Sequence, residues 1–136
     1  MIVDSSALVA MYRRERGFEG ILAAIETGAR IPAPVLVEFE RVVTKGGSIP
    51  PDNAKSFLTQ MIEDFEATVE PFIAEDAALA SEANVTHGAG NGRGGRLNLL
   101  DLMVYATARR LGLPILCTGT DFASTGIAIH PASRVG

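Results

Sequence analysis

Short apolar runs alternate along this chain with longer stretches in which apolar residues recur every three or four positions. The runs at residues 1–3 ("MIV") and 113–117 ("LPILC") are typical of buried strands. Residues 68–72 are rich in β-prone types, residues 127–130 ("IAIH") predict an edge strand, and residues 30–31 predict at most a stub of one. The chain is therefore expected to contain a few short strands.

The stretches between these strands have the periodicity and the end signals of helices. The predicted helices cover residues 5–15, 17–27, 34–45, 51–67, 75–85 and 99–111. Ser5 or Ser6 is expected to cap the first helix and Asn98 the last, which Gly112 ends. Strands separated by helices imply right-handed crossovers. We therefore predict an α/β fold with a mainly parallel central sheet flanked by helices.

The composition, with 47% hydrophobic residues, fits one compact domain over residues 1–136. No apolar stretch approaches the roughly 20 residues needed to span a bilayer, and no cleavable leader is visible. The lone Cys117 lies in an apolar run and is expected to be a small buried hydrophobe. These features predict a soluble, cytoplasmic protein that does not contact membranes.

The charged residues are distributed unevenly. The net charge of −4 argues against a protein that coats nucleic acid by charge alone. Residues 83–136 contain five arginines but only two acids, Asp101 and Asp121. Asp4 and Asp121 each follow a predicted strand, and Asp101 lies in the first turn of the last helix. Because sites in open α/β sheets form at the carboxyl ends of strands, the three acids are expected to share one rim.

Each of these acids also has a simpler interpretation. Asp4 can cap the first helix, and Asp121 can be an ordinary turn residue. Asp101 follows Asn98 by three residues and can complete a capping arrangement. The helical wheel places Asp101 beside a buried stripe, where a carboxylate without a partner is costly. The residues alone leave both interpretations open.

The helix predicted at residues 34–45 carries two glutamates, and the helical wheel does not show which of them belongs to the site. Glu38 and Glu40 flank opposite edges of an apolar stripe that includes Val35 and Phe39. His87 and His130 lack the spacing of metal ligands and are expected to be incidental.

Four segments occur in an order that resembles one protein family. They are "MIVDSSAL", "IPAPVLVEF", "LNLLDLMVYATARRLGLPIL" and "TGTDF". The chain is similar to PIN-domain ribonucleases and closely resembles the VapC-type toxins of bacterial toxin-antitoxin pairs. The combination is far more specific than any single acid, and it spans nearly the whole chain. The resemblance implies a PIN-like domain that hydrolyses RNA phosphodiester bonds as the toxin of a type II pair.

The resemblance implies a metal site made of carboxylates. Its members are Asp4, Glu38, Asp101 and Asp121, where Glu38 matches the family's acid at the eighth position of "IPAPVLVE". Carboxylate oxygens suit Mg²⁺ or Mn²⁺, and the metal is expected to activate the attacking water. Four further residues are expected to position water or phosphate, although caps and turns explain them equally well. They are Ser5, Ser6, Asn98 and Thr118.

RNA capture requires positive charge near the anionic site. The candidates are Arg13, Arg14, Arg93 and Arg96. The last two lie in "GNGRGGR", which also matches G-x-G-x-x-G from Gly90. A dinucleotide site is rejected, because no strand precedes the motif and no acid follows about twenty residues later. The segment is expected to be a mobile lid or a partner-contact loop.

The resemblance also implies partners. VapC-type proteins pair as homodimers and are inhibited by a small cognate antitoxin whose C-terminal segment covers the acidic site. The apolar surface for these contacts is expected on the first two predicted helices and on residues 51–67.

Two positions depart from the family pattern. Gly126 stands where many relatives carry another acid, and Pro32 stands where a small hydroxyl residue is common. The first departure weakens a second metal position and keeps open a catalytically weak or inactive PIN-like module that binds RNA or protein. Other carboxylate-based classes fit less well. A receiver domain needs a late lysine, whereas the lysines here are Lys45 and Lys55, and a haloacid-dehalogenase-like phosphatase needs an acid at Ser6.

Overall fold

The computed structural model describes residues 1–134 and alternates strands with helices, as the pattern predicts. The strands are β1 (Ile2–Val3), β2 (Arg30–Pro32), β3 (Thr68–Glu70) and β4 (Ile115–Leu116). The helices are α1 (Ser5–Tyr12), α2 (Phe18–Glu26), α3 (Ala33–Thr44), α4 (Pro51–Asp64), α5 (Ala74–His87) and α6 (Leu99–Leu111), and a short 3-10 turn η1 spans Ala123–Thr125. None of the helices within residues 1–134 has the length and hydropathy that crossing a bilayer requires.

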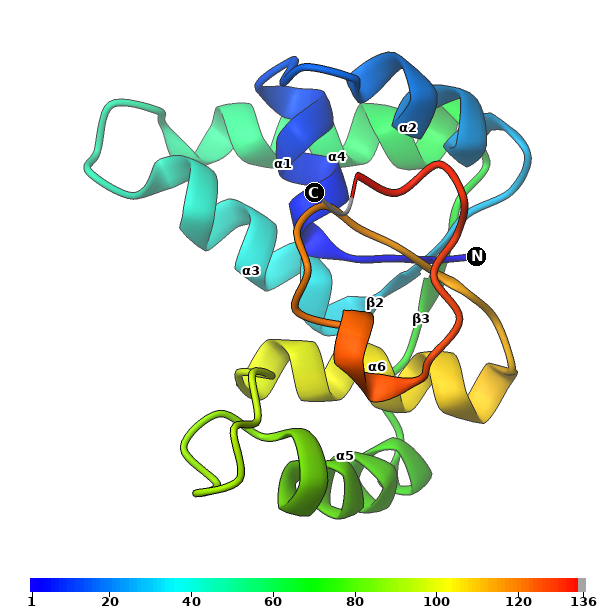
Figure 1. The fold of residues 1–136 in the computed structure, drawn as a ribbon. Coiled ribbons are helices and arrows are strands. Elements are labelled where there is room, and N and C mark those ends of the chain that lie inside the picture. The colour runs from blue at the N-terminus through cyan, green and yellow to red at the C-terminus, as the bar shows by residue number, and fades with distance from the viewer. Residues whose placement is uncertain (135–136) are drawn as a thin grey trace.

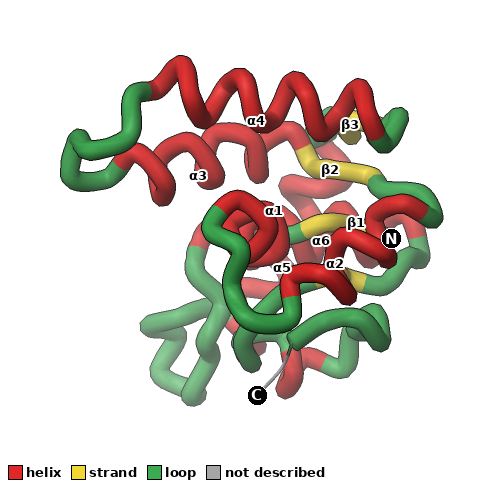
Figure 2. The backbone as a smooth tube through the Cα atoms, turned by 90° about the horizontal axis from the view of Figure 1, so that it is seen from above, coloured by secondary structure: helices red, strands yellow, loops and turns green. Residues whose placement is uncertain are grey.

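The four strands form one parallel sheet in the order β3-β2-β1-β4. Figure 2 shows the strands running side by side, with α3 and α4 packed as a pair beyond the β2 and β3 edge. Because β1 lies between β2 and β4, the residue that follows β1 emerges in the middle of the carboxyl edge. The predicted parallel α/β fold is confirmed, and residues 30–31 belong to a complete strand rather than to a stub.

Helices cover both faces of this sheet. Figure 1 shows α5 and α6 packed together below the sheet, whereas α1, α2 and α4 lie above it. The strands contribute fully buried side chains such as Ile2, Ile31 and Ile115. Above the sheet, the rings of Tyr12 and Phe39 meet edge to face with their centroids 5.7 Å apart, which ties α1 to α3.

The strands predicted at 68–72 and 113–117 are shorter in the structure, and three other elements differ more. The first helix ends at Tyr12, because Arg14 adopts a φ of 50° that a helix does not accommodate. The helix predicted over residues 51–67 ends at Asp64, with Glu66 at a φ of 49°. The predicted edge strand at 127–130 is wrong, since only an isolated bridge joins Ile129 to Ile115. The next rung of that ladder would use the Cys117 N–H, which donates to Ser133 Oγ instead.

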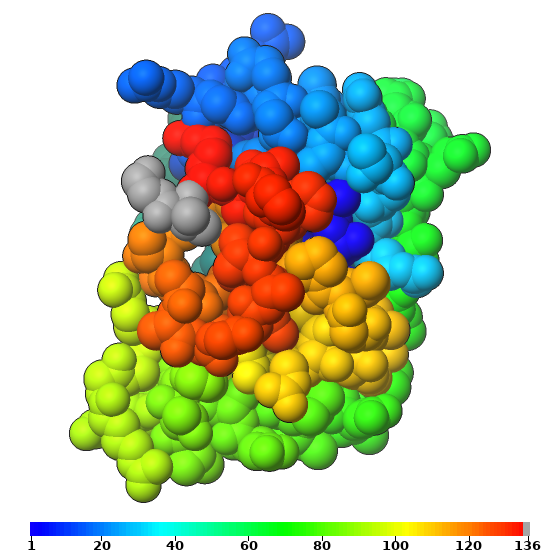
Figure 3. All heavy atoms as spheres, turned by 45° about the vertical axis from the view of Figure 1, so that its right-hand side comes forward, coloured from blue at the N-terminus to red at the C-terminus, as the bar shows by residue number. Residues whose placement is uncertain are grey.

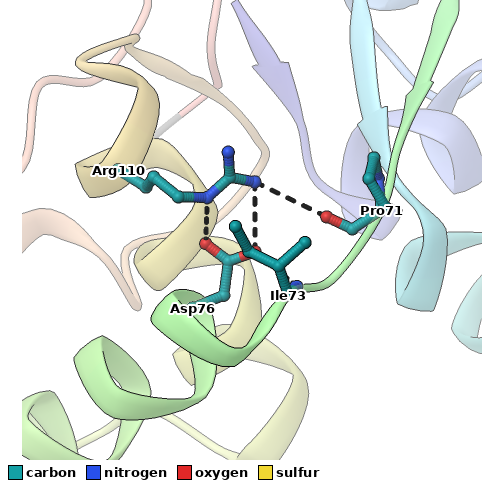
Figure 4. Close-up of polar contacts among 4 residues, drawn as sticks. All are labelled: Pro71, Ile73, Asp76 and Arg110. Atoms are coloured by element: carbon teal, nitrogen blue, oxygen red, sulfur yellow. Dashed lines mark hydrogen bonds and ion pairs between the residues drawn. The ribbon is translucent and has the colours of Figure 1, made fainter.

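A buried ion pair joins α5 to α6. The Arg110 guanidinium donates from Nε to Asp76 Oδ1 at 2.5 Å and from Nη2 to Asp76 Oδ2 at 3.1 Å (Figure 4). The Ile73 N–H also donates to Asp76 Oδ2, at 3.0 Å, and Arg110 reaches the Pro71 carbonyl at 3.5 Å. Asp76 is fully buried, so the pairing is what makes its charge tolerable.

Arg110→Met should therefore be strongly destabilising. It leaves the buried Asp76 charge without its cation, a change that typically costs about 3–5 kcal/mol of unfolding free energy. Urea unfolding followed by circular dichroism measures this loss. The matched control is Arg109→Met on the exposed side of the same helix turn, which loses one hydrogen bond to the Tyr105 hydroxyl and should cost about 1 kcal/mol. Equal losses in both variants would contradict a special role for the ion pair.

Candidate functional site at the carboxyl edge of the sheet

Asp4 is the first residue after the central strand, and it is both a helix cap and a candidate site residue. Its backbone N–H donates to the Leu116 carbonyl at 3.0 Å, which places the residue beside the end of β4. Its side-chain Oδ2 accepts from the N–H of Ser6 at 3.1 Å and from the Ser6 hydroxyl at 2.5 Å. The N-cap of α1 is thus Asp4 rather than Ser5 or Ser6, because Asp4 is the extended residue at which the chain turns into the helix.

The second carboxylate oxygen of Asp4 has no such partner. Asp4 is only 5% exposed, and Oδ1 is buried without a hydrogen bond from any residue in 1–134. Burial raises the pKa of Asp4 above its usual range, the hydrogen bonds from Ser6 and the Ser5 N–H oppose this rise, and the charge of Asp121 adds to it. The capping interpretation therefore accounts for one oxygen of Asp4 and leaves the other available.

Asp101 is likewise both part of a helix cap and a candidate site residue. Its N–H donates to Asn98 Oδ1 at 2.8 Å, and its Oδ2 accepts from the Asn98 N–H at 3.0 Å, which completes a capping box. Asp101 is 8% exposed, and burial is the main cause that raises its pKa from 3.8 to about 6. The charges of Asp4, Asp121 and Glu38 raise it further, so all four predicted acids share one electrostatic environment.

Glu38 approaches this environment from α3, which packs against α6. It lines a groove of about 740 Å³ together with Asn98 and Leu100 of α6. Of the two glutamates that the helical wheel left open, Glu38 is the one whose charge acts on Asp101. This placement agrees with the choice that the family resemblance implied.

Asp121 lies at the open side of the rim, in the turn that follows β4. Its side chain is 55% exposed, and its Oδ1 lies 3.7 Å from Nη2 of Arg96. Within residues 1–134 no group of three or more His, Cys, Asp or Glu side chains comes close enough together to hold a metal ion. The four acids therefore surround one region without forming a closed cage.

Hydrogen bonds tie the supporting residues into the same rim. The Ser6 hydroxyl, which donates to Asp4, also accepts from the Thr118 N–H at 3.0 Å and so joins the start of α1 to the segment after β4. Ser5 is buried, and Asn98 has the capping role described above. The sequence analysis missed Ser133, whose Oγ accepts from the Cys117 N–H at 3.1 Å and donates to the Ile115 carbonyl at 3.2 Å. No sequence signal marks this serine, because its partners lie 16 and 18 residues away.

The four candidate RNA-binding arginines lie in two separate places. Arg13 and Arg14 are exposed at the far end of α1, about 12 Å along the helix from Asp4 at the usual rise per residue. Arg93 and Arg96 lie in the loop between α5 and α6, beside Asp121. The structure thus brings only the second pair to the acidic rim.

The four acids come from the end of β1, from α3, from α6 and from the turn after β4, and they gather at the carboxyl edge of a short parallel sheet. This is the arrangement of a PIN-type domain. A family model described as PIN domain matches residues 1–128. The chain is 34% identical over 129 residues to VapC ribonuclease Mb2780c of Mycobacterium bovis, covering 93% of this chain and 96% of that protein. The chain therefore belongs to the PIN-domain family, as its motifs indicated.

Solved structures agree in fold. Mycobacterium tuberculosis VapC20, described as a sarcin-ricin loop cleaving toxin, superimposes with a TM-score of 0.71 at 17% identity and covers 93% of this chain and 95% of its own. A toxin-antitoxin complex from Klebsiella pneumoniae gives a TM-score of 0.63 at 18% identity, with 96% of both chains covered. At these identities the likeness concerns the fold alone.

The raised pKa of Asp101 predicts a pH dependence of stability in the metal-free protein. Between pH 3.8, the ordinary value, and about 6, the folded state binds more protons than the unfolded state. The free energy of unfolding should therefore fall as pH rises through this window, and the loss is complete above the folded-state pKa. Asp101→Asn keeps an oxygen for the Asn98 N–H and should flatten this slope. Urea unfolding in EDTA at successive pH values tests this, and equal slopes in both proteins would contradict it.

Proposed function

We propose that this protein is an endoribonuclease that hydrolyses RNA phosphodiester bonds and acts as the toxin of a type II toxin-antitoxin pair. The observation that carries the proposal is the gathering of Asp4, Glu38, Asp101 and Asp121 in one electrostatic environment at the carboxyl edge of a PIN domain. Membership of the family and the similarity to VapC ribonucleases support it. The catalytic residues proposed here are those four acids.

A divalent cation fits the residues of this rim. The buried Oδ1 of Asp4 has no partner within residues 1–134, and a cation would relieve the cost of that charge. Mg²⁺ keeps several waters and is commonly bound by one or two carboxylates together with substrate phosphates. A site without a three-carboxylate cluster therefore suits Mg²⁺ or Mn²⁺. Asp4 and Asp101 would hold the ion, with Glu38 and Asp121 completing the anionic surroundings.

The roles of the chain's own residues follow from their contacts. When bound, the ion supplies an acidified water and neutralises charge on the leaving oxygen. Ser6 orients the Asp4 carboxylate through Oδ2, and Asn98 orients Asp101 in the same way, so both acids are held in place before substrate arrives. Asp121 lies at the exposed side, where an RNA phosphate would enter.

The glycine at position 126 has a structural explanation. Gly126 ends the 3-10 turn at a φ of 77°, a left-handed conformation that glycine adopts without strain. An acid at this position would need the same left-handed conformation, which is strained for residues other than glycine. The local turn therefore explains why glycine stands where the family pattern has an acid. We propose that the chain is active with one metal ion. The alternative, an inactive PIN-like module that binds RNA or protein, is separated from this by the cleavage assay below.

We further propose that an antitoxin and a second copy of the chain are partners, in the cytoplasm. The apolar surface for such contacts differs from the expected one. Large apolar side chains that the described part of the chain leaves most exposed include Val37 at 68% and Leu99 at 73%, on α3 and α6. Both line the groove that also contains Glu38, so a partner seated there would lie against the acidic rim.

Purified protein should cleave structured RNA in the presence of Mg²⁺ or Mn²⁺, and excess EDTA should stop the reaction. Glu38→Gln should remove most of the activity, because its charge acts on Asp101, whereas Glu40→Gln on the same helix should change it little. Gel analysis of a labelled RNA measures both. Cleavage that persists in EDTA would contradict the metal requirement, and a larger loss in the Glu40 variant would show that the glutamate is misassigned.

Divalent ion should also stabilise the folded protein. At a hundredfold excess over Kd, binding to the native state alone adds roughly 2.7 kcal/mol, which raises Tm by several degrees. Asp4→Asn should remove cleavage and reduce this shift. Without metal it should be at least as stable as the natural protein, since Asn keeps an oxygen for Ser6 while removing a buried charge. Thermal melts with and without Mn²⁺ measure the metal-induced shift and the metal-free stability, and the gel assay measures cleavage. A metal-free variant that is clearly less stable yet still cleaves RNA would make Asp4 a helix cap only.

A further inference from the structure

The glycine-rich loop between α5 and α6 has a defined internal structure. Asn91 organises it: its Oδ1 accepts from the N–H of Arg93 at 2.8 Å and from that of Gly95 at 3.2 Å, and its Nδ2 donates to the Val85 carbonyl at 3.1 Å. The side chain of one asparagine thus joins the end of α5 to the middle of the loop.

The two ends of the loop also cross closely. The Leu97 N–H donates to the His87 carbonyl at 2.9 Å, and the Ala89 N–H donates to the Leu97 carbonyl at 2.7 Å. A Cβ at Gly95 would lie 2.3 Å from the Gly88 carbonyl oxygen, so only glycine permits this crossing. Leu97 is 1% exposed and anchors the loop in the core. The loop is therefore closed by its own hydrogen bonds, whereas its mobility stays a prediction.

This loop forms one wall of a polar pocket. Figure 3 shows the loop, in yellow-green, beside the orange turn that follows β4. The pocket between them has a volume of about 250 Å³. Its lining includes Arg93 and Arg96 from the loop, Thr86 and His87 from the end of α5, and Ser124 and Thr125 from the turn. The Asp121 carboxylate also lines the pocket and connects it to the acidic rim.

The chemistry of this lining is that of an anion site. Two guanidinium groups, an imidazole and the hydroxyls of Thr86 and Ser124 offer hydrogen-bond donors from three segments of the chain, whereas the Thr125 hydroxyl already donates to the Phe122 carbonyl. The volume is below the usual range of about 300–1,000 Å³ for small-molecule sites. A phosphate group matches both the size and the donors.

Arg96 is available to such a ligand. Its contact with Asp121 spans 3.7 Å, and the two side chains are 58% and 55% exposed. Exposed ion pairs of this kind contribute little free energy, so a phosphate can take over the guanidinium without a large cost.

We propose that this pocket binds one backbone phosphate of the RNA, next to the scissile phosphate, with Arg93 and Arg96 as the principal donors. The inference depends on the proposed ribonuclease function and adds to it a specific subsite. Phosphate contacts fix the register of a nucleic acid on a protein. Because the loop is closed by Asn91 and by the crossing at Gly95, the pocket holds its phosphate at a set distance from Asp121 and so selects which bond lies over the acidic rim.

The first test measures RNA binding apart from cleavage. In an Asp4→Asn background with Mg²⁺, fluorescence anisotropy with a labelled RNA hairpin gives the affinity and its salt dependence. Arg93→Gln and Arg96→Gln should each weaken binding by about tenfold, as expected for a charge-assisted hydrogen bond, and lower the salt slope by about one. The matched control is Lys55→Gln, an exposed cation on α4, which should change the affinity by no more than about twofold. Losses equal to that of the control would overturn the proposal.

A second test identifies the phosphate itself. Methylphosphonate linkages, which are neutral, replace the phosphates of the hairpin one at a time. At one position next to the cleaved bond, the replacement should weaken RNA binding to the Asp4→Asn protein by about tenfold. In a protein that also carries Arg93→Gln, the same replacement should lower the RNA affinity little further, because the partner of that phosphate is already missing. Losses that add at every position would overturn the subsite.

The outcomes separate the two proposals. If the natural protein cleaves RNA but the losses are additive, the phosphate pocket fails and the ribonuclease function stands. If the coupling is found at one linkage but the natural protein does not cleave RNA with Mg²⁺ or Mn²⁺, the pocket stands as a phosphate-binding site, and both the enzymatic function and the placement beside a scissile bond fail.

Discussion

The burial of the Asp4 carboxylate at the end of the central strand is the constraint around which this site is organised. The strand has only two residues and is paired on both sides, so the chain must turn into α1 as soon as it leaves the sheet. The turn needs a capping acceptor, which Asp4 supplies with one oxygen, and the other oxygen is left buried without a partner among residues 1–134. A buried charge with an unused acceptor is costly, and binding of a cation or a donor is what removes that cost.

At this rim the same two carboxylates cap helices and are candidate site residues. Asp4 and Asp101 are each held by a residue of their own helix start, through Oδ2 in both cases. This local anchoring fixes the carboxylates without help from a ligand, which is the preorganisation that a catalytic site requires. The Ser6 hydroxyl extends the arrangement across the sheet, because it bonds both Asp4 and the Thr118 N–H.

The pairing of α5 with α6 supports the other side of the site. The Asp76–Arg110 ion pair joins the start of α5 to the end of α6, and the glycine-rich loop joins the opposite ends of the same helices. The loop is therefore held by a rigid helix pair as well as by Asn91. Arg93 and Arg96 consequently line the pocket beside Asp121, whereas Arg13 and Arg14 extend from the far end of α1.

The sequence by itself determined the features that depend on neighbouring residues. The alternation of apolar runs and amphipathic stretches predicted the parallel α/β fold, and the Asn98 cap and Gly112 stop predicted α6 to the residue. The ordered motifs predicted the family and, through it, the four acids that the structure brings into one electrostatic environment. Only the tertiary structure decided the rest. It placed the charge of Glu38 where it acts on Asp101, which the helical wheel did not show, because that placement depends on how α3 packs against α6. It reduced residues 127–130 to a single bridge and closed the glycine-rich loop with hydrogen bonds, because both outcomes depend on backbone partners that local sequence does not specify. Propensity and capping act within a few residues, whereas the Ser6–Thr118 bond spans 112 positions and exists only once the sheet has formed.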